Sequence, residues 1–132
     1  MKRSREESQR WFKQSEYDFE AARRNFEQKI YSYACFIAEQ AAQKALKSFL
    51  ILKGERYVWE HSVQKLAEKC SYYDKKFTKF EASGAILDKY YLTTRYPDVI
   101  APPAIPYESY IEKEALEAID LAREILETVR IG

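Results

Sequence analysis

The sequence contains little glycine or proline. It has three glycines and four prolines in 132 residues, and three of the prolines fall between positions 102 and 106. A chain built of short strands needs frequent Gly and Asn turns between runs of alternating apolar residues, and such runs are missing. The scarcity argues against a β-sandwich or barrel, and it predicts an all-α protein.

Cysteine and histidine are also scarce, with two cysteines and one histidine in the chain. Cys35 and Cys70 stand alone without a CxxC pair, and one histidine cannot build a multi-histidine metal centre. We therefore expect no structural zinc, no other metal or cofactor, and two free thiols.

Long apolar runs and an excess of one charge are absent as well. No stretch approaches membrane-spanning length, and charged residues interrupt the N-terminal MKRSREESQRWF, so it has no apolar signal core. A formal net charge of +1 excludes a strong general attraction to nucleic acid or to an anionic membrane. We expect a cytoplasmic protein that does not bind membranes.

The composition that remains is typical of a globular domain. Apolar residues make up 46% of the chain and charged residues 33%, which is enough apolar material to form a core and too much for a disordered chain. At 132 residues, one domain spanning residues 1–132 is expected.

Apolar residues recur at steps of three and four over five stretches, which is the spacing of one helix face. The expected helices cover about residues 4–28, 31–53, 63–70, 74–95 and 107–129. The second carries small residues on its apolar face, which permits a close helix neighbour. Four long helices plus one short helix, mostly joined by short loops, predict an up-and-down helical bundle.

Three residues mark expected helix ends. Gly54 can adopt a positive φ at no steric cost and should end the second helix. Ser62 is suited to cap the N-terminus of the third helix. Pro97 disfavours a helical conformation at Tyr96, so the fourth helix should end in the segment LDKYYLTTRYPD, residues 87–98.

Arg95 lies at the end of an apolar helix face, and two interpretations of its role are open. A cation in the last helical turn interacts favourably with free carbonyls, by about 0.3 to 1 kcal/mol, and Asp98 could pair with it. Alternatively, an arginine beside an aromatic ring such as Tyr96 can bind phosphate in a bidentate manner and stack on a base.

His61 is the single side chain whose ordinary pKa is close to neutrality, and it directly precedes the expected cap Ser62. It could act as a general acid or base, or it could anchor the loop through a hydrogen bond. Tyr57 and Trp59 nearby could stack on a base or cover the core.

Several stretches together resemble the HEPN domain, the small helical module of higher eukaryotes and prokaryotes named for nucleotide binding, in its stand-alone prokaryotic type. They are the helix from Trp11 to Ala22, YSYACFIAEQAAQKALKSFLILKG, EHSVQKL, LDKYYLTTRYPD and the long C-terminal helix. The resemblance implies a bundle of four or five helices, usually a homodimer, and often a partnership with a minimal nucleotidyltransferase, as in toxin–antitoxin pairs.

Some members of that family are metal-independent ribonucleases with an arginine followed four to six residues later by a histidine. This chain has no histidine in that window after Arg95, so no catalytic residue is assigned, and His61 and Arg95 are kept as catalytic candidates. The leading hypothesis is a non-catalytic protein that binds a nucleotide or another phosphate-bearing ligand. The alternatives are a dimeric partner of a nucleotidyltransferase and an RNA endonuclease. The expected ligand-binding residues are Asp18, Gln40, Lys44, His61, Arg95, Tyr96 and Asp98.

Overall fold

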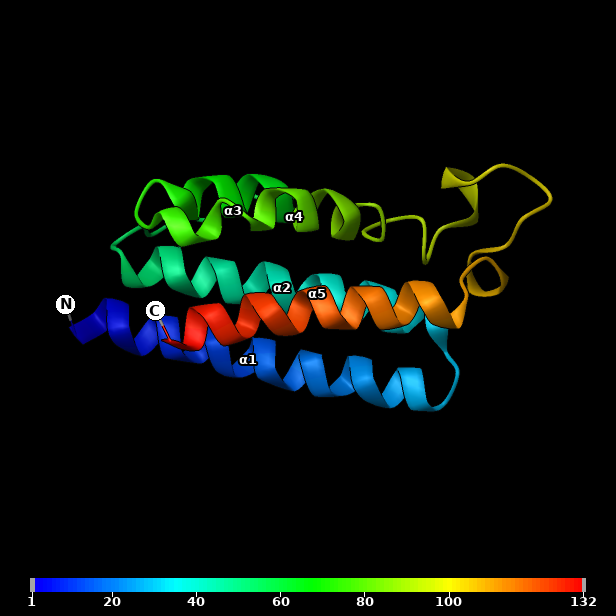
Figure 1. The fold of residues 1–132 in the computed structure, drawn as a ribbon, viewed down its shortest axis with the longest axis horizontal. Helices are drawn as coiled ribbons and strands as arrows, with labels where there is room; N and C mark the ends of the chain where they lie inside the picture. Colours follow the sequence, from blue (N-terminus) through cyan, green and yellow to red (C-terminus); the bar gives the residue numbers. More distant parts are fainter. Residues whose placement is uncertain (1, 132) are drawn as a thin grey trace.

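The computed structural model describes residues 2–131, without the side chain of Ile131, and among these residues it contains five α-helices and no strand. They are α1 (Lys2–Glu27), α2 (Tyr31–Leu52), α3 (Val63–Ser71), α4 (Phe80–Asp88) and α5 (Glu112–Ile131) (Figure 1). The predicted all-α class is confirmed. None of these helices is long and apolar enough to cross a membrane.

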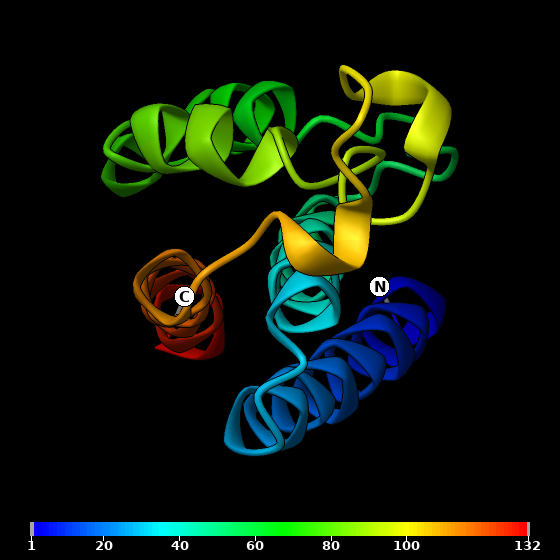
Figure 2. The same cartoon turned by 90° about the vertical axis from the view of Figure 1, so that its right-hand side faces the viewer.

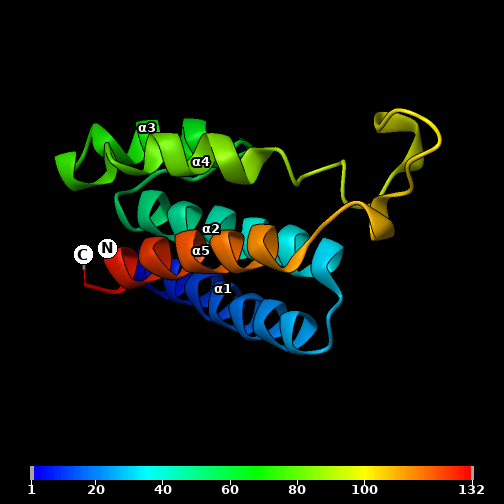
Figure 3. The same ribbon diagram turned by 45° about the vertical axis from the view of Figure 1, so that its right-hand side comes forward.

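Helix α2 lies in the middle of the bundle. In the view along the helices it is surrounded by α1, by α5 and by the pair formed by α3 and α4 (Figure 2). Helices α1 and α2 form an antiparallel hairpin, and α5 returns beside α2 so that it ends near the start of α1 (Figure 3). The segment between α4 and α5 extends beyond one end of the bundle (Figures 1 and 3).

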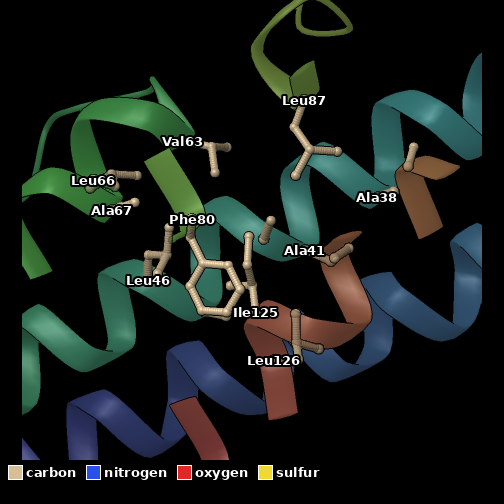
Figure 4. Close-up of a cluster of buried hydrophobic side chains, with 14 of the residues drawn as sticks. Ala38, Ala41, Leu46, Val63, Leu66, Ala67, Phe80, Leu87, Ile125 and Leu126 are labelled. Carbon is tan, nitrogen blue, oxygen red and sulfur yellow. The ribbon is translucent and has the colours of Figure 1, made fainter. Parts of the chain in front are cut away.

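The small residues of α2 give it room for three sets of neighbours. Ala34, Ala38, Ala41 and Ala45 are fully buried, as their helical spacing predicts. The core is completed by larger side chains from the surrounding helices, and Phe80 of α4 meets Leu46 and Ile125 there (Figure 4). A central helix buried nearly all round leaves few places for polar side chains, so those it carries need partners.

Helix α2 ends as its glycine predicts. Gly54 has φ of 104°, its N–H donates to the Ile51 carbonyl at 2.9 Å, and the Glu55 N–H donates to the Leu50 carbonyl at 3.1 Å. This pair of bonds is a Schellman motif, which satisfies carbonyls that the end of a helix leaves free.

Helix α3 begins at two capping side chains. The Ser62 hydroxyl accepts a hydrogen bond from the Lys65 N–H at 3.1 Å, which confirms the predicted cap. Asp88, the last residue of α4, adds a carboxylate that accepts bonds from the Ser62 hydroxyl and the Val63 N–H, both at 2.6 Å. An anion is favourable at a helix N-terminus, so Asp88 ties α4 to α3.

The fourth helix is shorter than predicted. Residues 74–95 form a 3₁₀ turn at Lys75–Phe77, then α4 at Phe80–Asp88, then a series of turns through Arg95. The hydroxyls of Thr93 and Thr94 donate to the carbonyls of Lys89 and Tyr90, the acceptors that a continuing α-helix would use. Tyr96 is extended, as the following Pro97 predicts.

The last helix begins five residues later than the predicted Tyr107. Residues Pro106–Glu108 form a separate 3₁₀ turn, and α5 starts at Glu112. The Glu114 carboxylate accepts a hydrogen bond from the Ile111 N–H at 3.2 Å, as the acidic residue of a capping box does. The start of α5 is therefore fixed by a side chain in its own first turn.

Candidate functional site

His61 and Arg95 each contact the same aromatic ring, that of Tyr91. The His61 imidazole stacks on Tyr91 with ring centroids 5.7 Å apart and planes 17° apart. The guanidinium carbon of Arg95 lies 5.6 Å from the centroid of the same ring. The turns that follow α4 carry Tyr91 and Arg95 to the loop before α3, so two residues far apart in the sequence share one site.

Arg95 is held mainly by aromatic rings. Its guanidinium carbon lies 3.9 Å from the Phe36 ring centroid and 4.9 Å from that of Tyr96, and Nη2 donates to the Tyr91 carbonyl. Cation–π contacts of this kind stabilise a guanidinium without neutralising it. Nε is buried and has no hydrogen-bond partner. Arg95 thus bonds a carbonyl just after α4, and none of these contacts neutralises its charge.

The ion pair that Asp98 could make with Arg95 does not form in the described part of the chain. Within residues 2–131, no carboxylate lies within ion-pairing distance of Arg95, and Asp98 is exposed in the 3₁₀ turn Pro97–Val99. The extended Tyr96 turns the chain away after Arg95, while the guanidinium folds back onto Phe36. Asp98 therefore lies in the turn that follows Arg95 and makes no ion pair with it.

Glu39 is a fully buried carboxyl on the side of α2 that faces this site. Its oxygens accept hydrogen bonds from the amides of Gln40 and Gln43, each at 2.8 Å. Burial raises the pKa of Glu39 to about 7, the two amides and the charge of Arg95 oppose the rise, and the charge of Asp88 adds to it. Near neutral pH, this carboxyl can therefore gain or lose a proton.

Gln43 connects Glu39 to His61. Its Nε2 donates to Glu39, and its Oε1 lies 3.3 Å from Nδ1 of His61. A side-chain oxygen that only accepts requires a proton on Nδ1, which leaves Nε2 of a neutral imidazole as an acceptor. In this arrangement, Glu39 and Gln43 set the tautomer of His61.

Two of the other expected residues pair with each other. Lys44 Nζ lies 2.6 Å from an Asp18 carboxylate oxygen, which joins α2 to α1. Both side chains are half-buried. Gln40 takes part in the site through its bond to Glu39. The structure therefore brings Gln40, His61, Arg95 and Tyr96 together and leaves Lys44 with Asp18 at the edge.

Four residues of the site are missing from the sequence-based prediction: Phe36, Glu39, Gln43 and Tyr91. The sequence does contain a sign that Glu39 is unusual, because it is the single acidic residue in α2. An acid in a helix that is apolar on nearly every side requires buried partners. We refer below to the group Phe36, Glu39, Gln43, His61, Tyr91 and Arg95 as the Tyr91 cluster.

The Tyr91 cluster offers a cation, an acceptor nitrogen and aromatic surface. A guanidinium without a carboxylate partner can bind two oxygens of a phosphate. The ring of Tyr96 beside it is 46% exposed and can stack on a base. In the described part of the chain, no group of three or more His, Cys, Asp or Glu side chains could hold a metal ion. Both cysteines are buried as free thiols, and burial raises the pKa of each to about 12.

Comparison with known proteins gives consistent matches over nearly the whole chain. The family model of the HEPN domain matches residues 8–132. Among solved structures, TT1696 from Thermus thermophilus is 33% identical, with a TM-score of 0.86 over 93% of this chain and 95% of that one. ST0689, described as an archaeal HEPN homologue, is 34% identical, with a TM-score of 0.73 over 93% of this chain and 94% of that one. None of the curated proteins matches the chain.

Proposed function

Because the chain belongs to the HEPN domain family, we propose that its Tyr91 cluster binds a nucleotide or another phosphate-bearing ligand. The observation that carries this proposal is that Arg95 and His61 both contact the Tyr91 ring. Among the described residues no carboxylate lies within ion-pairing distance of Arg95, so a phosphate would supply the directly paired anion that Arg95 does not have.

Each side chain has a distinct role in this proposal. Arg95 binds the phosphate, since a guanidinium can donate two parallel hydrogen bonds to its oxygens. Tyr96 offers its exposed ring to a base, and Nε2 of His61 accepts a hydrogen bond from a ribose hydroxyl or a base N–H. Glu39 and Gln43 bind nothing themselves but hold the imidazole in the tautomer that accepts.

Replacing Arg95 with methionine is expected to weaken ATP binding by about 10- to 100-fold, because a hydrogen bond to a charged group contributes about 1.5 to 3 kcal/mol. Methionine keeps a long side chain that can pack on Phe36 while it removes the charge. Isothermal titration calorimetry of both proteins with ATP, AMP and a short RNA measures the change.

The matched control is Arg123→Met, which removes an arginine of α5 that pairs with Asp120 at 2.7 Å and lies outside the Tyr91 cluster. The affinity of this control variant for ATP should equal that of the wild type. Absence of heat with all three ligands, or equal affinity in Arg95→Met, would refute the proposal.

A second candidate function, RNA endonuclease, is favoured by the same shared contact of His61 and Arg95 with Tyr91. A histidine with a free Nε2 can take the proton of an RNA 2′-hydroxyl, and a guanidinium can stabilise the charge that develops on the phosphorane. This candidate predicts cleavage of single-stranded RNA in the presence of a metal chelator and complete loss of cleavage in His61→Ala. Cleavage that persists unchanged in His61→Ala would come from a contaminant and would exclude this function.

A further inference from the structure

A hollow lies one turn beyond Gln43 along α2, and none of its lining residues belongs to the Tyr91 cluster. It has a volume of about 560 Å³ and lies between the first turns of α1, the last turns of α2 and residues 55–58. Trp11, Ile51 and Val58 give it apolar walls, and Tyr57 forms part of its rim. The volume falls in the range of sites for small organic molecules. We call it the Lys47 hollow, after the cation in its wall.

Lys47 is buried without a counter-ion. Its side chain lines the hollow, the residue is 5% exposed, and Nζ lies 5.6 Å from the centroid of the Trp11 ring. Throughout residues 2–131, no carboxylate comes within ion-pairing distance of it. A buried ammonium is costly without a partner. Burial lowers the pKa of Lys47, while the charges of Glu39 and Glu60 oppose that decrease.

The other charges around the hollow also favour an anion. Arg3 and Arg56 line it and, like Lys47, have no ion pair in the described part of the chain. The two acids in its wall already have partners. Glu7 pairs with Arg10 at 3.1 Å, and Glu55 accepts a hydrogen bond from the Tyr73 hydroxyl at 2.9 Å. The charged side chains in the lining are therefore three cations without ion pairs, Glu7 paired with Arg10, and Glu55 bonded to a neutral hydroxyl, so the cations outnumber the carboxylates.

We propose that the Lys47 hollow binds a small organic anion, in which a carboxylate, phosphate or sulfonate group is attached to a flat apolar body. Lys47 binds the anionic group at the inner wall, and Arg3 and Arg56 contact it from the rim. The apolar body lies against Trp11 and Val58, where it removes apolar surface from water. This site is independent of the proposed function, because the two share no residue.

The direct test uses 8-anilinonaphthalene-1-sulfonate, an apolar sulfonate whose fluorescence rises in a dry environment. The wild type should bind one molecule saturably, and Lys47→Met should bind at least tenfold more weakly. Methionine is close to lysine in size, and the loss of an unpaired buried charge should leave the fold intact. Lys53→Met removes an exposed lysine just after α2 and should bind like the wild type.

Competition identifies which part of the ligand is recognised. Indole-3-carboxylate should displace the dye from the wild type, and uncharged indole at equal concentration should not. Arg95→Met should bind the dye normally, so failure of the proposed nucleotide site would leave this result unchanged. Non-saturable binding, equal binding by Lys47→Met, or equal displacement by indole and its carboxylate would overturn the proposal.

Discussion

Replacing Gly84 with alanine is expected to lower the free energy of unfolding by about 3 kcal/mol, because the new methyl group would overlap a neighbouring backbone. A Cβ at position 84 would lie 2.5 Å from Cα of Gln64 and 2.8 Å from the carbonyl carbon of Val63, and it would also contact the Gln64 nitrogen. These atoms belong to the first turn of α3, which cannot move aside as the end of a side chain can. Urea unfolding followed by circular dichroism measures the loss.

The sign of the change at Gly84 is the informative result. At an open helical position, alanine is more favourable than glycine by about 1 kcal/mol. The reverse exchange, Ala85→Gly at the exposed neighbouring position in α4, should lower the free energy of unfolding by only about 1 kcal/mol. If Gly84→Ala were instead as stable as the wild type or more so, α3 and α4 could not be packed as closely as the structure has them.

The second large effect is a pH dependence that comes from Glu39. Its pKa is about 7 in the folded protein against an ordinary value of 4.5. Below pH 4.5 the carboxyl is protonated in both the folded and the unfolded states, so its burial carries no ionisation cost. As the pH rises toward 7 the unfolded state releases the proton first, and above 7 the full cost of about 3 kcal/mol opposes folding.

The variant Glu39→Gln removes this ionisation. Its stability relative to the wild type should increase by up to about 3 kcal/mol between pH 5 and pH 8. Urea unfolding of both proteins at pH 5, 6, 7 and 8 gives the difference at each pH. Glu124→Gln, at an exposed position of α5, serves as the control. Its free energy of unfolding should differ from that of the wild type by the same small amount at every pH. A pH-independent difference for Glu39→Gln would contradict the raised pKa.

The fold was largely predictable from local patterns. The alanine spacing of α2, the positive φ of Gly54 and the cap at Ser62 each depend on residues within one or two helical turns, and all three are confirmed. The length of α4 was wrong because its apolar spacing continues through residues 89–95, where threonine hydroxyls compete for the helix carbonyls. Periodicity cannot detect that competition.

The site was predictable only in part. His61 and Arg95 were singled out by residue type and by position at the ends of expected helices. Their meeting depends on Tyr91, whose ring belongs to a turn that the sequence predicted as helix. Glu39 and Gln43 enter the site through packing between α2 and the loop before α3, which no local pattern encodes. The single domain, the homodimer and the nucleotidyltransferase partner stay predictions.

The carboxylate of Asp88 has a consequence for how the Tyr91 cluster opens. It accepts hydrogen bonds from Ser62 and Val63 at the start of α3, directly after His61. Asp88 is also the last residue of α4 and lies three residues before Tyr91 in the sequence. The same carboxylate also accepts a bond from the Gln64 N–H at 3.3 Å, so the start of α3 and the end of α4 cannot separate without breaking all three bonds. We therefore expect the His61 loop and the Arg95 turn, which adjoin these two helix ends, to open as one cooperative unit. The exchange rate of the Val63 amide proton with solvent deuterium then reports how often the cluster comes apart, and a bound phosphate ligand would slow it.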